Sequence, residues 1–325
     1  MRVKRSASMI TPDFSCPGSK EDPVNVRIRF GVAAVAVAVL GLSACGSNSL
    51  GGEPATEASE APAPTSSVDA ALAAKLPESI KSSGVIRIGT DSSYPPNEFL
   101  AADGKTVEGW DVDLFNLVAQ KFGVKTQWQS ADFGTIITGV QGKKYDMGVS
   151  SFSINEDRKK QVTMVSYFYA GTQWGTAQGN PEGVDPGSPC GKTVAVQANT
   201  VQATEDLPVR QKKCGANKIN VLEYKLQDQA TNAVVSGKAD AMLSDSPVIA
   251  YAAKQTNGKI EPLGDVYEAA QYGYVLPKDQ TEFAQAIADA LKQMNDDGSY
   301  KAALEKWGVE QGAITDFAVN PSVKP

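Results

Sequence analysis

The chain has 325 residues, 42% of them hydrophobic, so it can bury a sizeable core and is long enough for two domains. With 31 Lys and Arg against 37 Asp and Glu, and no basic run, its composition argues against nucleic acid as a partner. The absence of histidine excludes Ser-His-Asp and Cys-His catalysis and the usual zinc sites. We therefore expect no metal, no cofactor and no catalytic residue.

The beginning of the chain has the pattern of a secreted bacterial protein. Arg27 and Arg29 precede an apolar run at 30–42, which has signal-peptide length and is too short to span a bilayer as a mature helix. The run leads into Leu-Ser-Ala-Cys, which resembles the lipobox of bacterial lipoproteins and implies cleavage before Cys45 and a lipid on its sulfur. We therefore predict a signal peptide over residues 1–44 and an extracytoplasmic protein anchored to the bacterial cell membrane.

The stretch after the predicted cleavage site has the composition of a tether. Residues 46–67 are rich in Gly, Pro, Ala, Glu and Ser and contain almost no large apolar side chain. Such a segment cannot form a core, so we predict a disordered tether over residues 45–75. Without residues 1–44 the chain keeps 25 basic and 34 acidic residues, a net charge of −9.

From residue 85 onward, short apolar strands alternate with amphipathic helices. The first strand, 85–90, ends at Asp91, and the first long helix begins near Asp111, which suits the N-cap position. Further strands are predicted at 125–129, 147–149, 193–197, 219–224, 239–244 and 272–276, and helices at 133–140, 203–213, from 229, at 283–294 and at 299–307. The Gly- and Pro-rich stretch 179–187 separates two runs of these units. The alternation predicts an α/β fold with a parallel sheet.

The strand at 147–149 ends in hydroxyl groups and is followed by an arginine. Ser150, Ser151 and Ser153 come first, and Arg158 follows one turn after the possible N-cap Asn155. Hydroxyl donors, a helix start and a guanidinium together suit a small anion such as a carboxylate. The alternative is a surface helix whose arginine is solvated.

A second copy of this local design lies further along the chain. Residues 139–150 read GVQGKKYDMGVS and residues 233–244 read AVVSGKADAMLS, each with a helix end, Gly-Lys, an Asp and an apolar strand that ends in serine. The second copy is followed by Asp245. An ordinary αβ connection with a glycine C-cap would also give this pattern. Because one copy ends near a cation and the other beside an anion, the two together suit a zwitterion.

Polar residues follow strands in both halves of the chain, at Asp91, Ser150, 199–200 and Asp245. In open α/β sheets, ligands bind beyond the carboxyl ends of the strands. The simplest arrangement brings these four positions together in one crevice between two lobes.

Cys190 and Cys214 remain after the leader cysteine Cys16 and the lipid site are set aside. One lies just before a predicted strand and the other just after a predicted helix, and these points share one end of a βα unit. A disulfide is therefore geometrically reasonable, and outside the cytoplasm it would persist and contribute roughly 3 kcal/mol. The alternative is two free, buried thiols.

Several motifs in order resemble one protein family. These are VIRIGTDSSYPPNEF, GWDVDLFNLVAQKFG, DFGTIITGVQGKKYDMGVSSFSINEDRKKQV, CGKTVAVQANT, ADAMLSDSPVIAYAAKQ and YGYVLPKD. They resemble the polar amino-acid-binding proteins of ABC importers, solute-binding protein family 3, over about residues 76–307. The resemblance implies the two-lobed type II periplasmic binding protein fold with two hinge crossovers. Its implied parts are a large lobe at 76–170 plus 272–310, a small lobe at 171–271 and a C-terminal tail at 311–325.

The resemblance also implies roles for two charged residues and their neighbours. Arg158 would hold the α-carboxylate of a free amino acid, with Ser153 and Thr200 assisting, and Asp245 would take its α-ammonium group. Ser150 and Ser151 would supply backbone and hydroxyl contacts.

The ligand side chain would lie between Tyr94 and Phe133, and Asp91 would accept a hydrogen bond from its far end. An ionised carboxylate only accepts hydrogen bonds, so this favours a basic amino acid first, then glutamine, and acidic ligands last. Gln197 stands where some glutamine binders carry a lysine, which weakens a glutamine assignment. The paired serines are closer to the pattern of lysine/arginine/ornithine binders.

The partners implied by the resemblance are a free amino acid, the transmembrane subunits of an ABC permease and, through Cys45, the membrane. The protein is expected to be a monomer. One alternative is a sensor that passes ligand occupancy to a signalling partner. Another is a cyclohexadienyl dehydratase-like enzyme, in which Asp91 or Glu98 would be the general acid.

Overall fold

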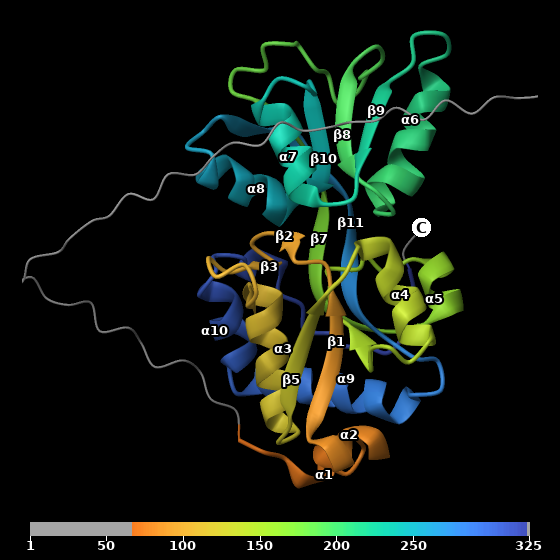
Figure 1. Ribbon diagram of the computed structural model, residues 1–325, viewed down its shortest axis with the longest axis vertical. Coiled ribbons are helices and arrows are strands. Elements are labelled where there is room, and N and C mark those ends of the chain that lie inside the picture. Colours follow the sequence, from red (N-terminus) through yellow and green to blue (C-terminus); the bar gives the residue numbers. More distant parts are fainter. Residues whose placement is uncertain (1–66, 324–325) are drawn as a thin grey trace, which may run out of the picture. The chain divides into compact units, whose positions relative to one another are not determined.

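The computed structural model of the protein describes residues 67–323 (Figure 1). The predicted signal peptide, the lipidation site Cys45 and most of the predicted tether lie outside these residues. The end of that tether is folded, however, because Leu72 is buried and the Asp69 carboxylate accepts backbone N–H groups at a helix start. The folded part therefore begins before residue 76. No helix in 67–323 is long and apolar enough to cross a bilayer.

An eight-stranded mixed sheet organises the described residues. Its order is β5 (Lys125–Ser130), β1 (Val85–Thr90), β6 (Met147–Gly148), β11 (Ile260–Leu276), β7 (Thr163–Ala177), β10 (Ala241–Asp245), β8 (Thr193–Gln197) and β9 (Asn220–Tyr224). A small antiparallel sheet contains β2 (Ser93–Tyr94), β3 (Glu98–Leu100) and β4 (Val107–Glu108). We call the part built on β1, β5 and β6 the large lobe and the part built on β8, β9 and β10 the small lobe.

Helices cover both faces of the strands in each lobe (Figure 1). The large lobe carries α1 (Ala70–Ala73), α2 (Glu78–Ser83), α3 (Trp110–Lys121), α4 (Phe133–Gln141), α5 (Glu156–Gln161), α9 (Thr281–Asp296), α10 (Ser299–Glu305) and the 3-10 turn η2 (Glu310–Gly312). The small lobe carries the π-helical turn η1 (Gln202–Asp206), α6 (Leu207–Lys213), α7 (Gln227–Val235) and α8 (Ser246–Gln255). The predicted stripe of α9 is buried in the large-lobe core, with Phe283, Ile287, Leu291 and Met294 at most 1% exposed.

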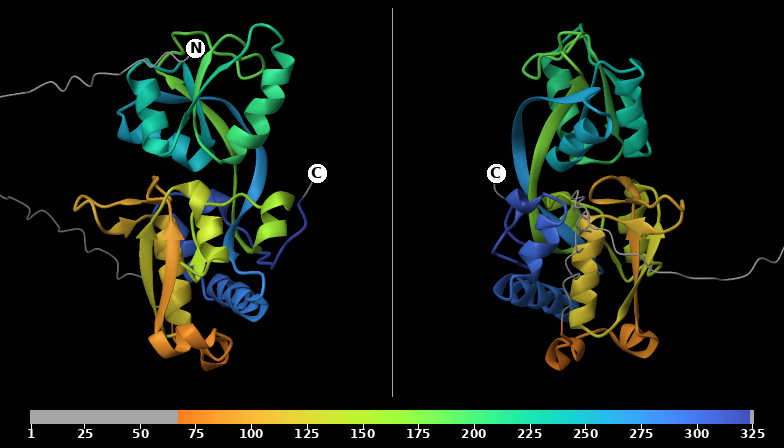
Figure 2. Two further views of the ribbon diagram at one scale, coloured as in Figure 1. Left: turned by 45° about the vertical axis from the view of Figure 1, so that its right-hand side comes forward. Right: turned by 90° about the vertical axis from the view of Figure 1, so that its left-hand side faces the viewer.

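Two long strands, β7 and β11, pass from one lobe to the other (Figures 1 and 2). They pair antiparallel from Ile260 opposite Ala177 to Leu276 opposite Thr163, with register shifts around Tyr267. The predicted parallel sheet is therefore interrupted at its centre, where β11 also runs antiparallel to β6, and β7 antiparallel to β10. The sequence pattern missed the first part of β11 because Pro262 and Gly264 are poor strand formers.

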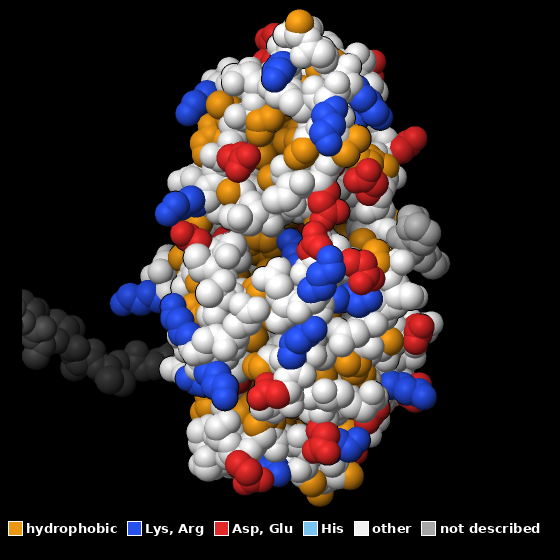
Figure 3. Space-filling view, turned by 90° about the vertical axis from the view of Figure 1, so that its right-hand side faces the viewer, with side chains coloured by type: hydrophobic (Ala, Val, Ile, Leu, Met, Phe, Trp, Pro, Cys, Tyr) orange, Lys and Arg blue, Asp and Glu red, His pale blue; other side chains and the backbone are white. Residues whose placement is uncertain are grey.

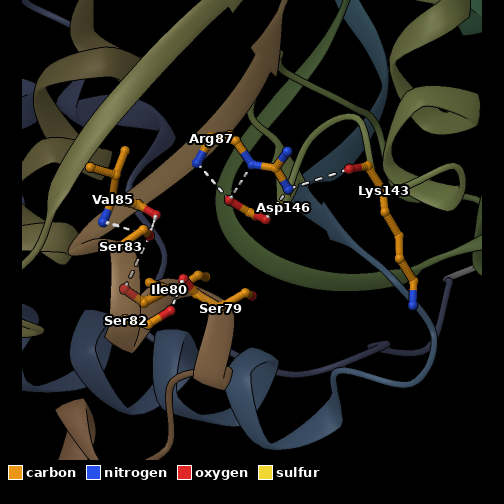
Figure 4. Close-up of polar contacts among 8 residues, drawn as sticks. All are labelled: Ser79, Ile80, Ser82, Ser83, Val85, Arg87, Lys143 and Asp146. Atoms are coloured by element: carbon orange, nitrogen blue, oxygen red, sulfur yellow. Dashed lines mark hydrogen bonds and ion pairs between the residues drawn. The ribbon is translucent and has the colours of Figure 1, made fainter.

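A hydrogen-bonded ion pair fixes β6 against β1 (Figure 4). The Asp146 carboxylate accepts the backbone N–H of Arg87 at 2.8 Å and two N–H groups of its guanidinium at 2.7 and 3.1 Å. In return the Asp146 N–H donates to the Arg87 carbonyl at 2.9 Å. Because Asp146 directly precedes β6, these bonds set the register that delivers the serines after β6 to the edge of the sheet.

Two further segments stabilise the lobes. In the small lobe, Cys190 and Cys214 form the predicted disulfide, with 5.3 Å between their Cα atoms. In the large lobe, the C-terminal segment pairs with β7, where Val319 bridges Val165 and the Asn320 N–H donates to the Met164 carbonyl at 2.7 Å. This segment belongs to the predicted C-terminal tail at 311–325, and its contacts with β7 hold it in place.

Candidate functional site

A narrow cavity lies between the two lobes at the carboxyl ends of the parallel strands. It is lined by Asp91, Tyr94, Glu98, Phe133, Ser150, Ser151, Ser153, Arg158, Gln197, Thr200, Val201, Gln202 and Asp245. All ten positions that the sequence singled out for ligand binding are therefore brought together, while their roles toward a ligand stay predictions. Sequence reasoning gave Glu98, Val201 and Gln202 no place among the ligand-binding residues.

The lobes contact each other around this cavity. Gln227 of the small lobe donates its backbone N–H to the Ser93 hydroxyl at 3.0 Å, and the Asn155 amide donates to Glu205 at 2.6 Å. Lys225 forms an ion pair of 3.3 Å with Asp132. Acidic and basic side chains accordingly meet at mid-height on one face (Figure 3). Contacts of this kind exist only while the lobes are together.

Arg158 lies on α5 in the cavity wall of the large lobe. The Asn155 side chain caps this helix as predicted, accepting the Arg158 N–H at 2.8 Å. The guanidinium donates to the carbonyls of Ser153 at 2.7 Å and of Asn199, in the small lobe, at 3.2 Å. Its carbon lies 5.3 Å from the centre of the Phe133 ring, within cation–π range. These contacts fix its direction.

The charge of Arg158 is not neutralised by a carboxylate at hydrogen-bonding distance. The side chain belongs to a residue only 8% exposed, and none of the ion pairs among residues 67–323 includes it. Burial lowers the pKa of Arg158 to about 10, against the opposing effect of nearby Glu205 and Asp245. The guanidinium therefore stays charged at neutral pH, and an anion in the cavity would relieve the cost of burying it.

Asp245 supplies a buried carboxylate on the opposite, small-lobe side of the cavity. Its Oδ1 accepts from the Gln202 amide at 2.8 Å and its Oδ2 from the Tyr272 hydroxyl at 2.7 Å. Burial raises the pKa of Asp245, while these hydrogen bonds and the Arg158 charge act to lower it. Although Asp245 occupies the N-cap position of α8, its side chain makes no capping bond and is held by Gln202 and Tyr272 instead.

Gln202 is a residue that sequence reasoning missed. It belongs to the π-helical turn η1, where a helix was predicted to begin at 203, and also donates to Thr172 on β7 at 3.0 Å. A local widening of this kind re-aims side chains and is frequent at functional sites. No sequence pattern announces it. The amide side chain of Gln202, two residues after the predicted ligand residue Thr200, was the only hint of a role in the site.

Asp91 lies at the end of β1 with every acceptor position in use. Oδ1 accepts the N–H and hydroxyl of Ser93 at 3.1 and 2.6 Å, and Oδ2 accepts the Phe133 N–H at 3.0 Å and the Gln197 amide at 2.9 Å. A carboxylate has about four lone-pair sites. A ligand donor would therefore have to replace one of these bonds, and Gln197 is the only one of these donors that reaches across from the small lobe.

The remaining predicted residues lie around the cavity as follows. The Tyr94 hydroxyl accepts from Ser244 Oγ at 3.0 Å and from the Asp245 N–H at 3.3 Å, and Phe133 stacks on Phe152 at 4.6 Å. The Thr200 hydroxyl donates to the Gln197 carbonyl at 2.8 Å. The two rings thus belong to the large lobe, and the Tyr94 hydroxyl reaches the small lobe.

Glu98 and Asp111 form a buried acidic layer beside the cavity. Glu98 accepts the hydroxyls of Ser150 at 3.3 Å and Ser151 at 3.2 Å. Asp111 was predicted to be the N-cap of its helix, but Gly109 holds that position, with φ of 139°. The Asp111 side chain points into the core instead, where it accepts the Tyr167 hydroxyl at 2.5 Å. The N-cap prediction for Asp111 failed because an aspartate near a helix start has the same sequence pattern whether it caps the helix or is buried in the core.

Comparison with known proteins places the chain in a functional context. Residues 86–310 match the model of the bacterial extracellular solute-binding proteins, family 3. The chain is 35% identical over 252 residues to the arginine-binding protein ArgT of Corynebacterium glutamicum, covering 77% of this chain and 82% of that one. It is 31% identical over 243 residues to the lysine/arginine/ornithine-binding periplasmic protein of Escherichia coli, covering 72% and 89%.

A solved structure gives the same likeness in three dimensions. An ancestral arginine-binding protein bound to arginine superimposes with a TM-score of 0.65 at 30% identity, covering 69% of this chain and 98% of that one. The two-lobed architecture predicted from the sequence is confirmed by this likeness.

Proposed function

The chain belongs to the bacterial extracellular solute-binding proteins of family 3, and on that basis we propose that it binds a free basic amino acid, arginine first, between its lobes. Glutamine ranks next and acidic amino acids last. One observation carries the proposal. Arg158 and Asp245, buried and of opposite charge, line one cavity from different lobes and form no ion pair with each other.

This charge arrangement fits the two poles of an amino acid. The guanidinium of Arg158 pairs with the α-carboxylate, and Asp245 accepts from the α-ammonium group. Charge-assisted hydrogen bonds are worth roughly 1.5–3 kcal/mol each, whereas micromolar affinity needs about 8 kcal/mol. The lobes must therefore close over the ligand so that exclusion of water adds the remainder.

The other part of the cavity favours a positively charged side chain. Asp91 and Glu98 both line it, and Arg158 is the only basic residue among the described lining residues. An acidic ligand side chain would place a further negative charge beside the buried carboxyl groups of Asp91 and Glu98, which costs several kcal/mol. The names of the similar proteins, which bind arginine or lysine, arginine and ornithine, support the same order.

We further propose that the protein is held to the outer surface of the cell membrane through lipid on Cys45 and hands its ligand to an ABC permease. The family is extracellular, which supports the location. The lipobox-like Leu-Ser-Ala-Cys motif supports the anchor. Labelling cells with a fatty-acid analogue tests it, because Cys45→Ala should abolish the label and release the protein from the membrane.

Thermal-shift and calorimetric titration with the twenty amino acids, ornithine and citrulline test the ligand. We expect the largest rise in melting temperature with arginine. Arg158→Ala should abolish this rise, and Lys160→Ala, an exposed cation on the same helix, should preserve it. No shift with any amino acid, or an unchanged shift in Arg158→Ala, would refute the proposal.

A further inference from the structure

Glu98 and Asp111 form a pair of carboxyl groups sealed from solvent. Glu98 lies on β3 and Asp111 on α3, and both residues are 0% exposed. Tyr167, Ser151 and Glu98 approach the Asp111 carboxyl, and the Asp111 N–H donates to the carbonyl of Asn97, the residue before Glu98, at 3.1 Å. Glu98 also lines the ligand cavity, whereas Asp111 does not, so the pair connects the cavity wall to the core.

The hydrogen bonds around the pair leave one acceptor without a donor. Tyr167 donates to Asp111 Oδ2, but Asp111 Oδ1 is buried and has no donor of good geometry among the described residues. The Ser151 hydroxyl donates to Glu98 and accepts from the Asn97 amide at 2.8 Å. A proton on Glu98 would supply a donor to Asp111, because a protonated carboxyl donates one hydrogen bond.

Electrostatics leads to the same conclusion. No ion pair of residues 67–323 includes Glu98 or Asp111. Two adjacent carboxylates without a cation cannot both stay ionised in a buried site. Burial raises the pKa of Glu98 well above its ordinary value, and the Asp111 charge raises it further. Burial likewise raises the pKa of Asp111 to about 7.

The charged and titratable neighbours of the pair do not supply the missing positive charge. They are Asp91 after β1, Tyr167 on β7, Tyr272 and Tyr274 on β11, and, across the same cavity, Arg158 on α5 and Asp245 on β10. Burial raises the pKa of all three of these tyrosines, so their hydroxyls stay neutral. Arg158 is assigned to the ligand carboxylate.

We propose that Glu98 and Asp111 share one proton at neutral pH, and that a cationic ligand side chain displaces it from Glu98 to solvent on binding. This inference rests on the proposed function and names the residue that selects charge within that site. One positive charge enters and one proton leaves, so the buried layer keeps its net charge. A neutral side chain of the same shape leaves the proton on Glu98. The pair therefore discriminates arginine from its neutral analogue citrulline.

The sign of the pH dependence follows from the raised pKa values. The folded chain retains a proton that the unfolded chain releases above about pH 4, so the free energy of unfolding without ligand falls as the pH rises from about 4 toward the raised pKa of the folded pair. Arginine replaces that proton, so its affinity should strengthen with pH, by up to tenfold per pH unit. Citrulline affinity should not change.

Calorimetric titration of L-arginine in buffers of different ionisation enthalpy measures the proton count directly. We expect the wild type to release close to one proton per arginine and none per citrulline. Glu98→Gln keeps an amide that can contact both serines, so it should release no proton and bind arginine roughly 10- to 100-fold more weakly. Glu108→Gln removes the same charge from an exposed position on β4 and should behave as wild type.

The outcomes separate this inference from the proposed function. If arginine binds wild type without releasing a proton, or if Glu98→Gln still releases one, the inference is overturned while the ligand assignment stands. If no amino acid binds at all, both are overturned. Infrared difference spectra of wild type provide a check that does not depend on a folded variant. The carbonyl band of a protonated carboxylic acid should disappear when arginine binds, and its persistence would contradict the proposal.

Discussion

Each lobe contains one copy of the repeated sequence stretch, residues 139–150 in the large lobe and 233–244 in the small lobe. The first copy is followed by the cation Arg158 and the second by the anion Asp245. In the large lobe the Asp146 carboxylate accepts the N–H of Arg87, and in the small lobe the Asp240 carboxylate accepts the N–H of Thr193, both at 2.8 Å. Each Asp also donates its own N–H back to the carbonyl of that residue, at 2.9 and 2.8 Å. In both lobes, an aspartate just before a strand therefore fixes that strand to its parallel neighbour.

The copies diverge after Ser150 and Ser244, the serines that close the two matching sequence stretches. After β6, Ser151 adopts a φ of 50°, the chain turns, and Arg158 follows on α5. In the small lobe Asp245, the last residue of β10, follows Ser244 at once, and Gln202 and Tyr272 donate hydrogen bonds to its side chain. The scaffold thus sets where a side chain is presented, and the few residues after it set the sign of the charge. A zwitterion needs one of each.

The largest effect is expected at Asp245, where the small-lobe copy presents its charge. Asp245→Asn keeps the shape of the side chain and removes the anion that we propose accepts from the ligand ammonium group. We expect arginine affinity to fall by about 100-fold, or roughly 3 kcal/mol, as measured by calorimetric titration.

The matched control for Asp245→Asn lies in the same copy. Asp240→Asn changes the same chemistry at the other end of the strand, outside the cavity, and should lower stability by about 1 kcal/mol with little change in affinity. Equal losses of affinity in both variants would mean that the copy acts only as scaffold and that Asp245 does not contact the ligand.

Removing the disulfide, which lies entirely in the small lobe, should have the second largest effect, a loss of stability. Cys190 and Cys214 enclose a segment that contains β8, η1 and α6. Replacing both with Ser should lower the free energy of unfolding by roughly 3 kcal/mol, measured by urea denaturation. Hydrogen exchange should show the loss first in β8 and β9. A uniform loss over both lobes would argue that they unfold as one unit.

Much of the fold followed from the sequence because its signals are local. Strand ends, the Asn155 cap and the α9 stripe depend on neighbours within a few residues, and the charged ends of the two copies could be read in the same way. The start of β11 was missed because its pairing with β7 is a long-range contact that compensates for weak strand propensity.

Parts of the site were missed for a similar reason. Asp111 reads as a helix cap, and only tertiary packing reveals that Glu98 and Tyr167 surround it. Gln202 acquires its role from a π-helical turn that no residue pattern indicates. Sequence reasoning found ten residues that line the cavity and missed others, such as Gln202, that hold those residues in place.

A smaller effect is expected on stability when the two aspartates that fix strands, Asp146 and Asp240, are replaced, and the two losses can be compared directly. Asp146 accepts the guanidinium of Arg87 in addition to its backbone N–H, whereas Asp240 has only a threonine opposite. Arg87 is half exposed, which limits the value of its charge. We expect Asp146→Asn to cost about 2 kcal/mol of stability and Asp240→Asn about 1, by thermal denaturation. The reverse order would show that the guanidinium contributes nothing.

The smallest expected effect concerns a contact between the lobes outside the cavity. The centre of the Phe99 ring on β3 lies 6.2 Å from the centre of the Tyr251 ring on α8, in the other lobe. It lies 6.0 Å from the centre of the Trp307 ring, within the large lobe. The first contact forms only when the lobes meet, so Tyr251→Ala should weaken arginine binding by about fivefold, the equivalent of ~1 kcal/mol, without changing the order of ligands.

A double-mutant cycle tests whether this effect comes from the pair. Phe99→Ala and Tyr251→Ala should be coupled in affinity, because either change removes the same contact from the closed form. Phe99→Ala and Trp307→Ala should be coupled in stability and not in affinity, since their contact persists in both forms. If Tyr251→Ala leaves affinity unchanged, the lobes are held together by the cavity residues, and the aromatic contact only accompanies closure.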